Sequence, residues 1–157
     1  MIQILFICTG NTCRSPMAEA LMRRKLAERG VDGVRVSSAG VGAWDGAPAT
    51  EGAYLVALEH GLDLSAHRAR KLTREIAGGA TLILTMARPH RARVDEVISP
   101  GRAHLLGEYA GEGGPQAEVR DPFGGDMEGY RETYNQLDQL LDEVVARLER
   151  ERSGDLR

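Results

Sequence analysis

Residues 2–16 read IQILFICTGNTCRSP, and this stretch decides the fold. Ile2 to Ile7 is a nearly continuous apolar run, which is typical of a strand that is buried on both faces of a sheet. A polar turn follows at once. Ser15-Pro16 then predicts a helix start, because serine caps helices and proline is tolerated at the first helical position. The stretch therefore predicts a strand, a tight turn and a helix in direct succession.

Strands and helices continue to alternate along the rest of the chain. The hydrophobic pattern predicts further strands at residues 34–38, 80–85 and 103–106, and helices at residues 50–60, 73–77, 89–98 and 130–150. Residues 107–126 are rich in glycine and proline and are predicted to form a long loop. This alternation predicts a single α/β domain over residues 1–157, with a parallel sheet of about four strands and helices on both faces.

The bulk composition narrows the possible functions. The 157 residues carry a net charge of −3, so an anionic partner needs a local positive site, and no general attraction to nucleic acid or membrane is expected. The apolar stretches are too short to span a bilayer, and the N-terminus lacks the basic leader of a signal peptide. Cys8 and Cys13 lie too close together to cross-link a fold, which indicates thiol chemistry in a reducing compartment. We expect a cytoplasmic protein, and a monomer, with no nucleic-acid or membrane partner.

The turn from Cys8 to Ser15 has the composition of a phosphate-binding loop, and ligands of parallel sheets sit at this carboxyl end of the strands. Backbone N–H groups that lead into a helix point inward, and the helix dipole adds positive potential. Gly10 and Asn11 are residue types that tolerate the left-handed conformations of an anion-binding nest. Arg14 supplies a planar fork of donors that matches two phosphate oxygens. In this positive field the Cys8 thiol is favoured as the nucleophilic thiolate. The alternative, a buried strand end beside a surface arginine, leaves the turn composition without an explanation.

A candidate acid lies in the long loop near the C-terminus. Nucleophilic attack needs a group that protonates the leaving atom, and the best candidate is Asp121 in the run Asp121-Pro122-Phe123-Gly124-Gly125. Pro122 restricts the residue before it to extended geometry, which fixes the direction of Asp121. Phe123 can form one wall of a pocket. An Asp-Pro pair alone usually marks only a turn, but together with the Cys8 loop it predicts a general acid.

Cys-x5-Arg-Ser directly after the first strand, with a late Asp-Pro-aromatic run, resembles the low-molecular-weight protein-tyrosine phosphatases, and the resemblance covers essentially the whole chain. It implies that Cys8 forms a phosphocysteine intermediate and that Arg14 clamps the phosphoryl oxygens. It also implies that Asp121 donates a proton to the leaving group and later accepts one from the hydrolytic water. The implied activity is that of a phosphatase of phosphorylated proteins, with no metal and no other cofactor.

The resemblance implies supporting residues as well. Besides Cys8 and Arg14, the phosphate-binding loop would comprise Thr9, Gly10, Asn11, Thr12, Cys13 and Ser15. Ser15 is expected to hydrogen-bond the Cys8 sulfur and to stabilise it as a leaving thiolate. Asn11 is expected to hold the loop in shape through a network with Ser38 and His67.

Thr12 and the run from Asp121 to Gly125 make the sequence most similar to the bacterial branch of the family that includes protein-arginine phosphatases. Many tyrosine-directed members have isoleucine where this chain has Thr12, and a shorter wall with a hydroxyl suits a guanidinium better than a phenyl ring. Trp44 and Phe123 are expected to line the pocket, where they can stack on either group. Phosphoarginine is therefore the favoured substrate and phosphotyrosine the alternative. Thr12 as an ordinary loop residue stays a third interpretation.

Two other functions use the same kind of loop. Arsenate reduction needs further cysteines to relay a disulfide, and the chain has none after Cys13. A non-catalytic anion-binding module has no need of Asp121 beside the loop.

Cys13 either traps an oxidised Cys8 as a disulfide or is a small buried packing residue. Three further histidines have no metal-ligand spacing and are expected at the surface or at helix ends: His60, His90 and His104.

Overall fold

The apolar run at the N-terminus forms an inner strand of a four-stranded parallel sheet. The computed structural model describes residues 1–153, and residues 154–157, which the predicted domain includes, lie outside the described part. The strands pair in the order β2-β1-β3-β4. Their bounds are Ile2–Cys8 for β1, Val34–Gly40 for β2, Leu82–Thr85 for β3 and Ala103–Leu105 for β4. The predicted α/β class with four parallel strands is confirmed.

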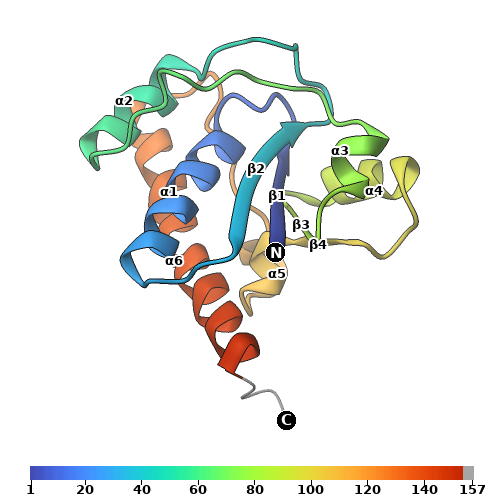
Figure 1. The fold of residues 1–157 in the computed structure, drawn as a ribbon. Helices are drawn as coiled ribbons and strands as arrows, with labels where there is room; N and C mark the ends of the chain where they lie inside the picture. The colour runs from blue at the N-terminus through green and yellow to red at the C-terminus, as the bar shows by residue number, and fades with distance from the viewer. Residues whose placement is uncertain (154–157) are drawn as a thin grey trace.

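Helices cover both faces of the sheet (Figure 1). On one face lie α1 (Arg14–Glu28), α2 (Glu51–Glu59) and α6 (Met127–Ser153), and on the other lie α3 (Arg74–Gly78) and α4 (Arg88–Val97). The side chains of β1 alternate between the two cores. Ile4 and Phe6 pack with α1 and α6, whereas Leu5 and Ile7 pack with α3 and α4. Burial on both sides explains why β1 is apolar at nearly every position.

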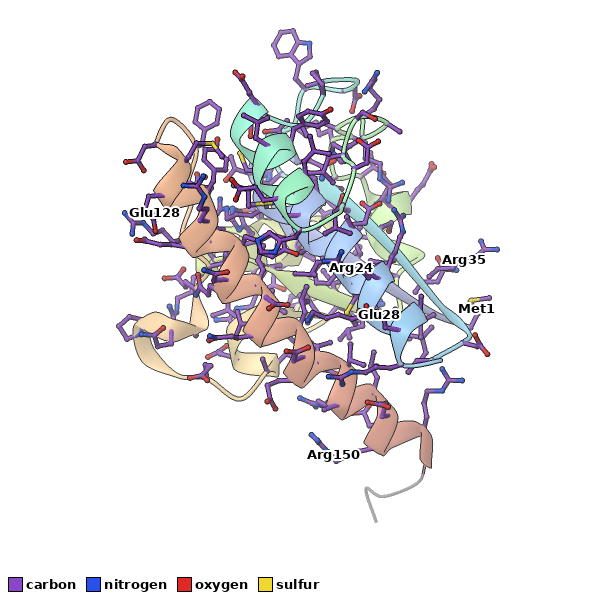
Figure 2. All side chains as sticks on the ribbon, turned by 90° about the vertical axis from the view of Figure 1, so that its left-hand side faces the viewer. Met1, Arg24, Glu28, Arg35, Glu128 and Arg150 are labelled. Carbon is purple, nitrogen blue, oxygen red and sulfur yellow. The ribbon has the colours of Figure 1, made fainter. Side chains whose placement is uncertain are left out.

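The C-terminal helix α6 lies along α1, as the view in Figure 2 shows. Its apolar stripe is fully buried at Leu137, Leu141 and Val144, as the helical spacing predicts. Arg24 of α1, labelled in Figure 2, donates a hydrogen bond to the hydroxyl of Tyr134 on α6 (3.2 Å). α6 therefore supports the helix that begins at the loop after β1.

The long loop predicted at residues 107–126 is partly helical, so that prediction was wrong in part. The segment contains α5 (Leu106–Tyr109) and the short 3₁₀ helix η1 (Gly114–Ala117). Gly107 lies against the backbone of Ala117, where a Cβ atom would come within 2.3 Å of the carbonyl oxygen. Because these turns depend on a contact between two short segments, hydrophobic periodicity does not reveal them.

The boundaries of several elements also differ from the prediction. β3 begins at Leu82 rather than at residue 80, and α6 begins at Met127 rather than at residue 130. Ser15 does not cap α1, which begins at Arg14 with Cys13 in the capping position and no side-chain cap. The Ser15 hydroxyl is unavailable for capping because it contacts two side chains of the loop.

Candidate active site

The loop after β1, residues 9–13, lies at the carboxyl end of the sheet and leads directly into α1. Asn11 has a φ angle of 56°, in the left-handed region that asparagine tolerates better than most residues. Gly10 was expected to share this conformation and does not. Glycine instead avoids crowding there, because a Cβ atom at position 10 would lie 3.3 Å from the hydroxyl oxygen of Thr12.

Asn11 holds the loop from inside through four hydrogen bonds. Its side-chain amide donates to the hydroxyls of Ser15 (2.8 Å) and Ser38 (2.9 Å). Its side-chain oxygen accepts from the backbone N–H of Arg70 (2.9 Å), and its backbone carbonyl accepts from Nε2 of His67 (2.7 Å). The structure thus brings the loop together with Ser38 on β2 and with His67, which is distant in sequence.

Cys8 ends β1, and its sulfur lies 2.9 Å from the hydroxyl oxygen of Ser15. Only 2% of Cys8 is exposed, so the sulfur forms the floor of the site rather than a surface thiol. The Ser15 oxygen accepts the Asn11 amide hydrogen, which leaves the Ser15 hydroxyl hydrogen for the sulfur. This arrangement supplies a hydrogen-bond donor to the Cys8 sulfur.

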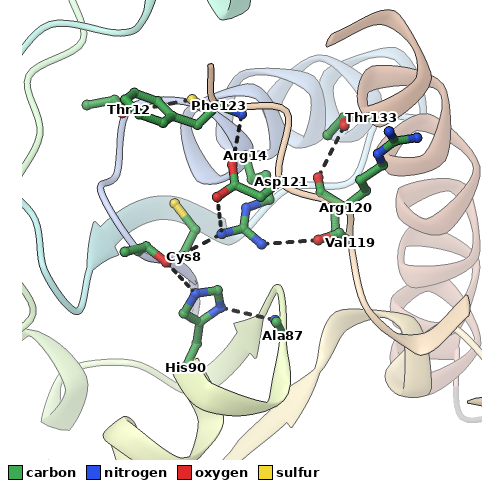
Figure 3. A network of polar contacts seen from close by, with 12 residues as sticks. Cys8, Thr12, Arg14, Ala87, His90, Val119, Arg120, Asp121, Phe123 and Thr133 are labelled. Atoms are coloured by element: carbon green, nitrogen blue, oxygen red, sulfur yellow. Dashed lines mark hydrogen bonds and ion pairs between the residues drawn. The ribbon is translucent and has the colours of Figure 1, made fainter. Parts of the chain in front are cut away.

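The Arg14 guanidinium is buried and is fixed from three sides (Figure 3). Nη1 donates to the carbonyl oxygen of Val119 (3.1 Å), and Nη2 donates to Oγ1 of Thr9 (3.4 Å). Nη2 also lies 3.5 Å from the Asp121 carboxylate. Because these contacts hold the plane of the fork, Arg14 can offer its donors to an anion without first losing rotamer freedom.

Asp121 lies at the mouth of the site, in the segment between η1 and α6. One carboxylate oxygen accepts from the backbone N–H of Phe123 (3.0 Å), and the other faces Arg14. The preceding Arg120 is tied to α6, because the Thr133 hydroxyl donates to its carbonyl oxygen (3.1 Å). The carboxyl side chain is half exposed, which leaves it accessible to a leaving group and to water.

These side chains surround a cavity of about 220 Å³. It is lined by Cys8, Thr9, Gly10, Thr12, Cys13, Arg14, Asp121 and Phe123. Phe123 is 70% exposed and stands at the rim. Trp44, expected in the same pocket, is 84% exposed and is not among the lining residues, because the loop between β2 and α2 carries it outward.

His90 is a site neighbour that sequence reasoning missed. It was expected at the surface or at a helix end. It does lie in the first turn of α4, where Nδ1 accepts from the backbone N–H of Ala87 (3.0 Å), but it is only 4% exposed. Its Nε2 lies 2.9 Å from Oγ1 of Thr9 in the loop. Burial and then the nearby Arg14 charge lower the pKa of His90 to about 4. No sequence signal links residues that are 81 positions apart.

Cys13 also has partners that its sequence position did not predict. Its sulfur lies 3.3 Å from the Thr50 hydroxyl and 3.8 Å from the Tyr130 hydroxyl. Burial raises the pKa of the Cys13 thiol above its usual range. Both Cys8 and Cys13 are free thiols.

No helix within residues 1–153 combines the length and the apolar character that crossing a membrane requires. Over the same described part of the chain, no three His, Cys, Asp or Glu side chains gather closely enough to bind a metal ion.

A parallel sheet that ends in an anion-binding turn, with a thiol at its floor and an arginine fork beside it, is the arrangement of a cysteine-dependent phosphatase. The family described as "Low molecular weight phosphotyrosine protein phosphatase" matches residues 3–154. The chain belongs to this family and is a cysteine-dependent protein phosphatase.

Relatives of two kinds resemble the chain to the same degree. A protein-arginine-phosphatase of Geobacillus stearothermophilus is 38% identical over 95% of this chain and 97% of its own length. The low molecular weight protein-tyrosine-phosphatase Etp of Escherichia coli K12 is also 38% identical, over 94% of this chain and 95% of its own. A solved structure of a YwlE arginine phosphatase mutant with a phosphorylated active-site serine superimposes with a TM-score of 0.90, at 35% identity, over 97% of this chain and 99% of that one.

Proposed function

We propose that this phosphatase hydrolyses phosphoarginine in proteins through a phosphocysteine at Cys8. The observation that carries the substrate assignment is Thr12, which lines the same cavity as Cys8. A hydroxyl-bearing wall suits a guanidinium, which carries several N–H donors, better than it suits a phenyl ring. Overall identity does not separate the two substrates, because arginine- and tyrosine-directed relatives are equally similar to the chain.

The first step transfers the phosphoryl group to Cys8. The thiolate attacks phosphorus, the S–P bond forms, and the P–N bond breaks with its electron pair going to nitrogen. Asp121 donates its proton to that nitrogen, and arginine leaves as a guanidinium. Arg14 and the backbone N–H groups of the loop stabilise the phosphoryl oxygens in the transition state.

The contact between Arg14 and Asp121 prepares this step. Nη2 of Arg14 lies 3.5 Å from the Asp121 carboxylate. A bound phosphoryl dianion competes for the same Nη2 atom and brings negative charge next to the carboxyl group. Substrate binding would thus weaken the contact between Arg14 and Asp121 and leave the carboxyl group facing the leaving group.

The second step regenerates the enzyme. Asp121, now a carboxylate, accepts a proton from a water molecule that attacks phosphorus. The S–P bond breaks, phosphate is released, and Cys8 departs as a thiolate that accepts the Ser15 hydroxyl hydrogen. The 2.9 Å contact between sulfur and hydroxyl supports this role of Ser15.

A Thr12→Ile variant tests the substrate assignment. We expect kcat/KM on a phosphoarginine peptide to fall by about 10-fold or more, because a wall built to hydrogen-bond a substrate discriminates strongly once its polar group is removed. Turnover of p-nitrophenyl phosphate should change by no more than about 2-fold, since an aryl group has no N–H donor. Thr12→Val, which removes only the hydroxyl, is the matched control for bulk. Equal losses on both substrates contradict the assignment.

The alternative is a phosphotyrosine phosphatase, and the observation in its favour is Phe123. Its ring is largely exposed at the cavity rim, where it can stack on a phenol. The parent enzyme decides between the two when phosphoarginine and phosphotyrosine versions of one peptide are assayed side by side. A higher kcat/KM on phosphotyrosine favours the alternative.

We also propose that the enzyme works as a monomer in the cytoplasm. Cys8 must be a free thiol to react, and both cysteines are free, which suits a reducing compartment. One chain supplies every residue that lines the cavity. Light scattering should give a single species of 17.1 kDa, and cell fractionation should recover it with cytoplasmic markers. A dimer contradicts the proposed monomer, and recovery outside the cytoplasm contradicts the proposed location.

A further inference from the structure

His90 is buried beside the phosphate-binding loop, yet the chemistry of Cys8, Arg14 and Asp121 does not use it. Its two ring nitrogens have defined roles. The backbone N–H of Ala87 donates to Nδ1, so in the neutral ring the hydrogen is on Nε2. Nε2 therefore donates to Oγ1 of Thr9, at 2.9 Å.

Thr9 receives a second donor from the opposite side. Nη2 of Arg14 lies 3.4 Å from the same hydroxyl oxygen. A hydroxyl has two acceptor lone pairs and one hydrogen, and these two donors occupy both lone pairs. Thr9 is left with its own hydroxyl hydrogen, and the residue lines the cavity together with Cys8.

We propose that His90 is a positioning residue that acts through Thr9. It fixes the Thr9 oxygen between two donors. The Thr9 hydroxyl then becomes an additional donor to the bound phosphoryl group, and the Arg14 fork keeps its orientation. This proposal rests on the roles assigned above to Cys8 and Arg14 and does not depend on whether the substrate is phosphoarginine or phosphotyrosine.

The charges around His90 keep it in the neutral form that this role requires. Arg14 repels a proton on the ring, whereas Asp121 and Glu118 attract one, and burial outweighs the attraction. Protonation would place a hydrogen on Nδ1, facing the Ala87 N–H, and would break that bond. With its pKa lowered to about 4, the ring is neutral at neutral pH.

Two substitutions of matched polarity separate positioning from helix support. His90→Asn keeps an acceptor at the place of Nδ1 for Ala87 but is too short to reach Thr9. His90→Gln keeps a terminal N–H that reaches Thr9. We expect His90→Asn to lower kcat/KM for p-nitrophenyl phosphate and to raise the Kd of inorganic phosphate, each by about 10-fold, and His90→Gln to restore most of both.

A double-mutant cycle with Thr9 completes the test. Thr9→Val should reproduce the loss, Thr9→Ser, which keeps the hydroxyl, should lose less than Thr9→Val, and His90→Asn should cost nothing further in the Thr9→Val background. Equal losses in His90→Asn and His90→Gln, or losses that add to those of Thr9→Val, overturn the proposal and leave His90 with helix support alone. If His90→Asn does not fold, His90→Gln decides alone: losses as large as those of Thr9→Val overturn the proposal, because the terminal N–H of glutamine still reaches Thr9.

The phosphate-binding measurement keeps the two proposals apart. If the parent enzyme binds inorganic phosphate but does not hydrolyse phosphoarginine, the proposed substrate is wrong. The phosphate-binding measurement then still tests the role of His90. If the parent enzyme is active on phosphoarginine and His90→Asn binds inorganic phosphate as tightly as the parent does, the proposed substrate is supported and the role of His90 is overturned.

Discussion

The side-chain amide of Asn11 donates to the hydroxyl oxygen of Ser15 at 2.8 Å, and this one bond sets the direction of another. Because the Ser15 oxygen is an acceptor for Asn11, its hydrogen is free for the Cys8 sulfur 2.9 Å away. Asn11 can reach Ser15 because its backbone takes a left-handed turn at φ 56°. The strained turn and the hydrogen bond offered to the Cys8 sulfur are therefore parts of one arrangement.

Ser15→Ala should slow the release of phosphate from the phosphocysteine more than its formation. The hydrogen bond from Ser15 to the Cys8 sulfur becomes stronger as the sulfur gains negative charge. A hydrogen bond to a charged group contributes about 1.5–3 kcal/mol, or about 10- to 100-fold in rate. Stopped-flow assays with p-nitrophenyl phosphate should show a retained burst and a slower steady state. Ser65→Ala, at an exposed loop position, is the control. A lost burst with an unchanged steady state contradicts the role of Ser15.

Gly40→Ala should distort the phosphate-binding loop, although residue 40 lies outside that loop. A Cβ atom at position 40 would lie 2.5 Å from the Thr9 carbonyl oxygen and 2.8 Å from the Asn11 nitrogen. The backbone must shift to relieve this overlap. We therefore expect the free energy of unfolding to fall by about 1–3 kcal/mol and activity to fall strongly.

Gly42→Ala is the matched control for this prediction, because its nearest neighbours would be 3.9 Å away. It should change the free energy of unfolding by less than about 0.5 kcal/mol. Urea unfolding and p-nitrophenyl phosphate assays of both variants measure the difference. Equal effects would show that the loop tolerates a shift at residue 40.

Cys13→Ala should abolish the recovery of enzyme that has been inactivated by peroxide. Oxidised Cys8 carries a sulfenic acid. The Cys13 thiolate can attack its sulfur, forming the S–S bond and releasing hydroxide, and a dithiol then reduces the disulfide. Cys8 and Cys13 line the same cavity. Since burial raises the pKa of Cys13, protection of the parent should improve as the pH rises. Recovery identical to that of the parent would make Cys13 a packing residue.

The sequence predicted the elements whose cause is local. β1 was recognisable because both of its faces are buried, and the turn after it because its residue types suit a loop between a strand and a helix. Contacts between distant segments were not predictable. Gly107 against Ala117 orders part of an expected loop, and His90 reaches Thr9 across the sheet edge. Nothing in either local pattern encodes such a meeting.

Trp44 and Ser15 show a second limit. An aromatic residue in a loop near the site was expected in the pocket, but the direction of the loop between β2 and α2 leaves Trp44 exposed. Ser15, which precedes a proline, was expected to cap a helix. Its hydroxyl instead contacts the side chains of Asn11 and Cys8 in the site. Residue type predicted what each side chain can do, and tertiary structure decided which of these it does.

His90 should make the stability of the fold depend on pH below neutrality. Its pKa is lowered from an ordinary value of 6.5 to about 4 in the folded protein, so between these pH values the unfolded chain binds more protons than the folded one. Stability therefore falls as the pH decreases from 6.5 toward 4, and the contribution is fully present above 6.5. In urea unfolding at pH 7.5 and 4.5, the parent should lose on the order of 1–2 kcal/mol more than His90→Asn. His104→Asn, at an exposed position, should lose as much as the parent. The same loss in His90→Asn as in the parent would mean that His90 is protonated in the folded protein as readily as in the unfolded chain.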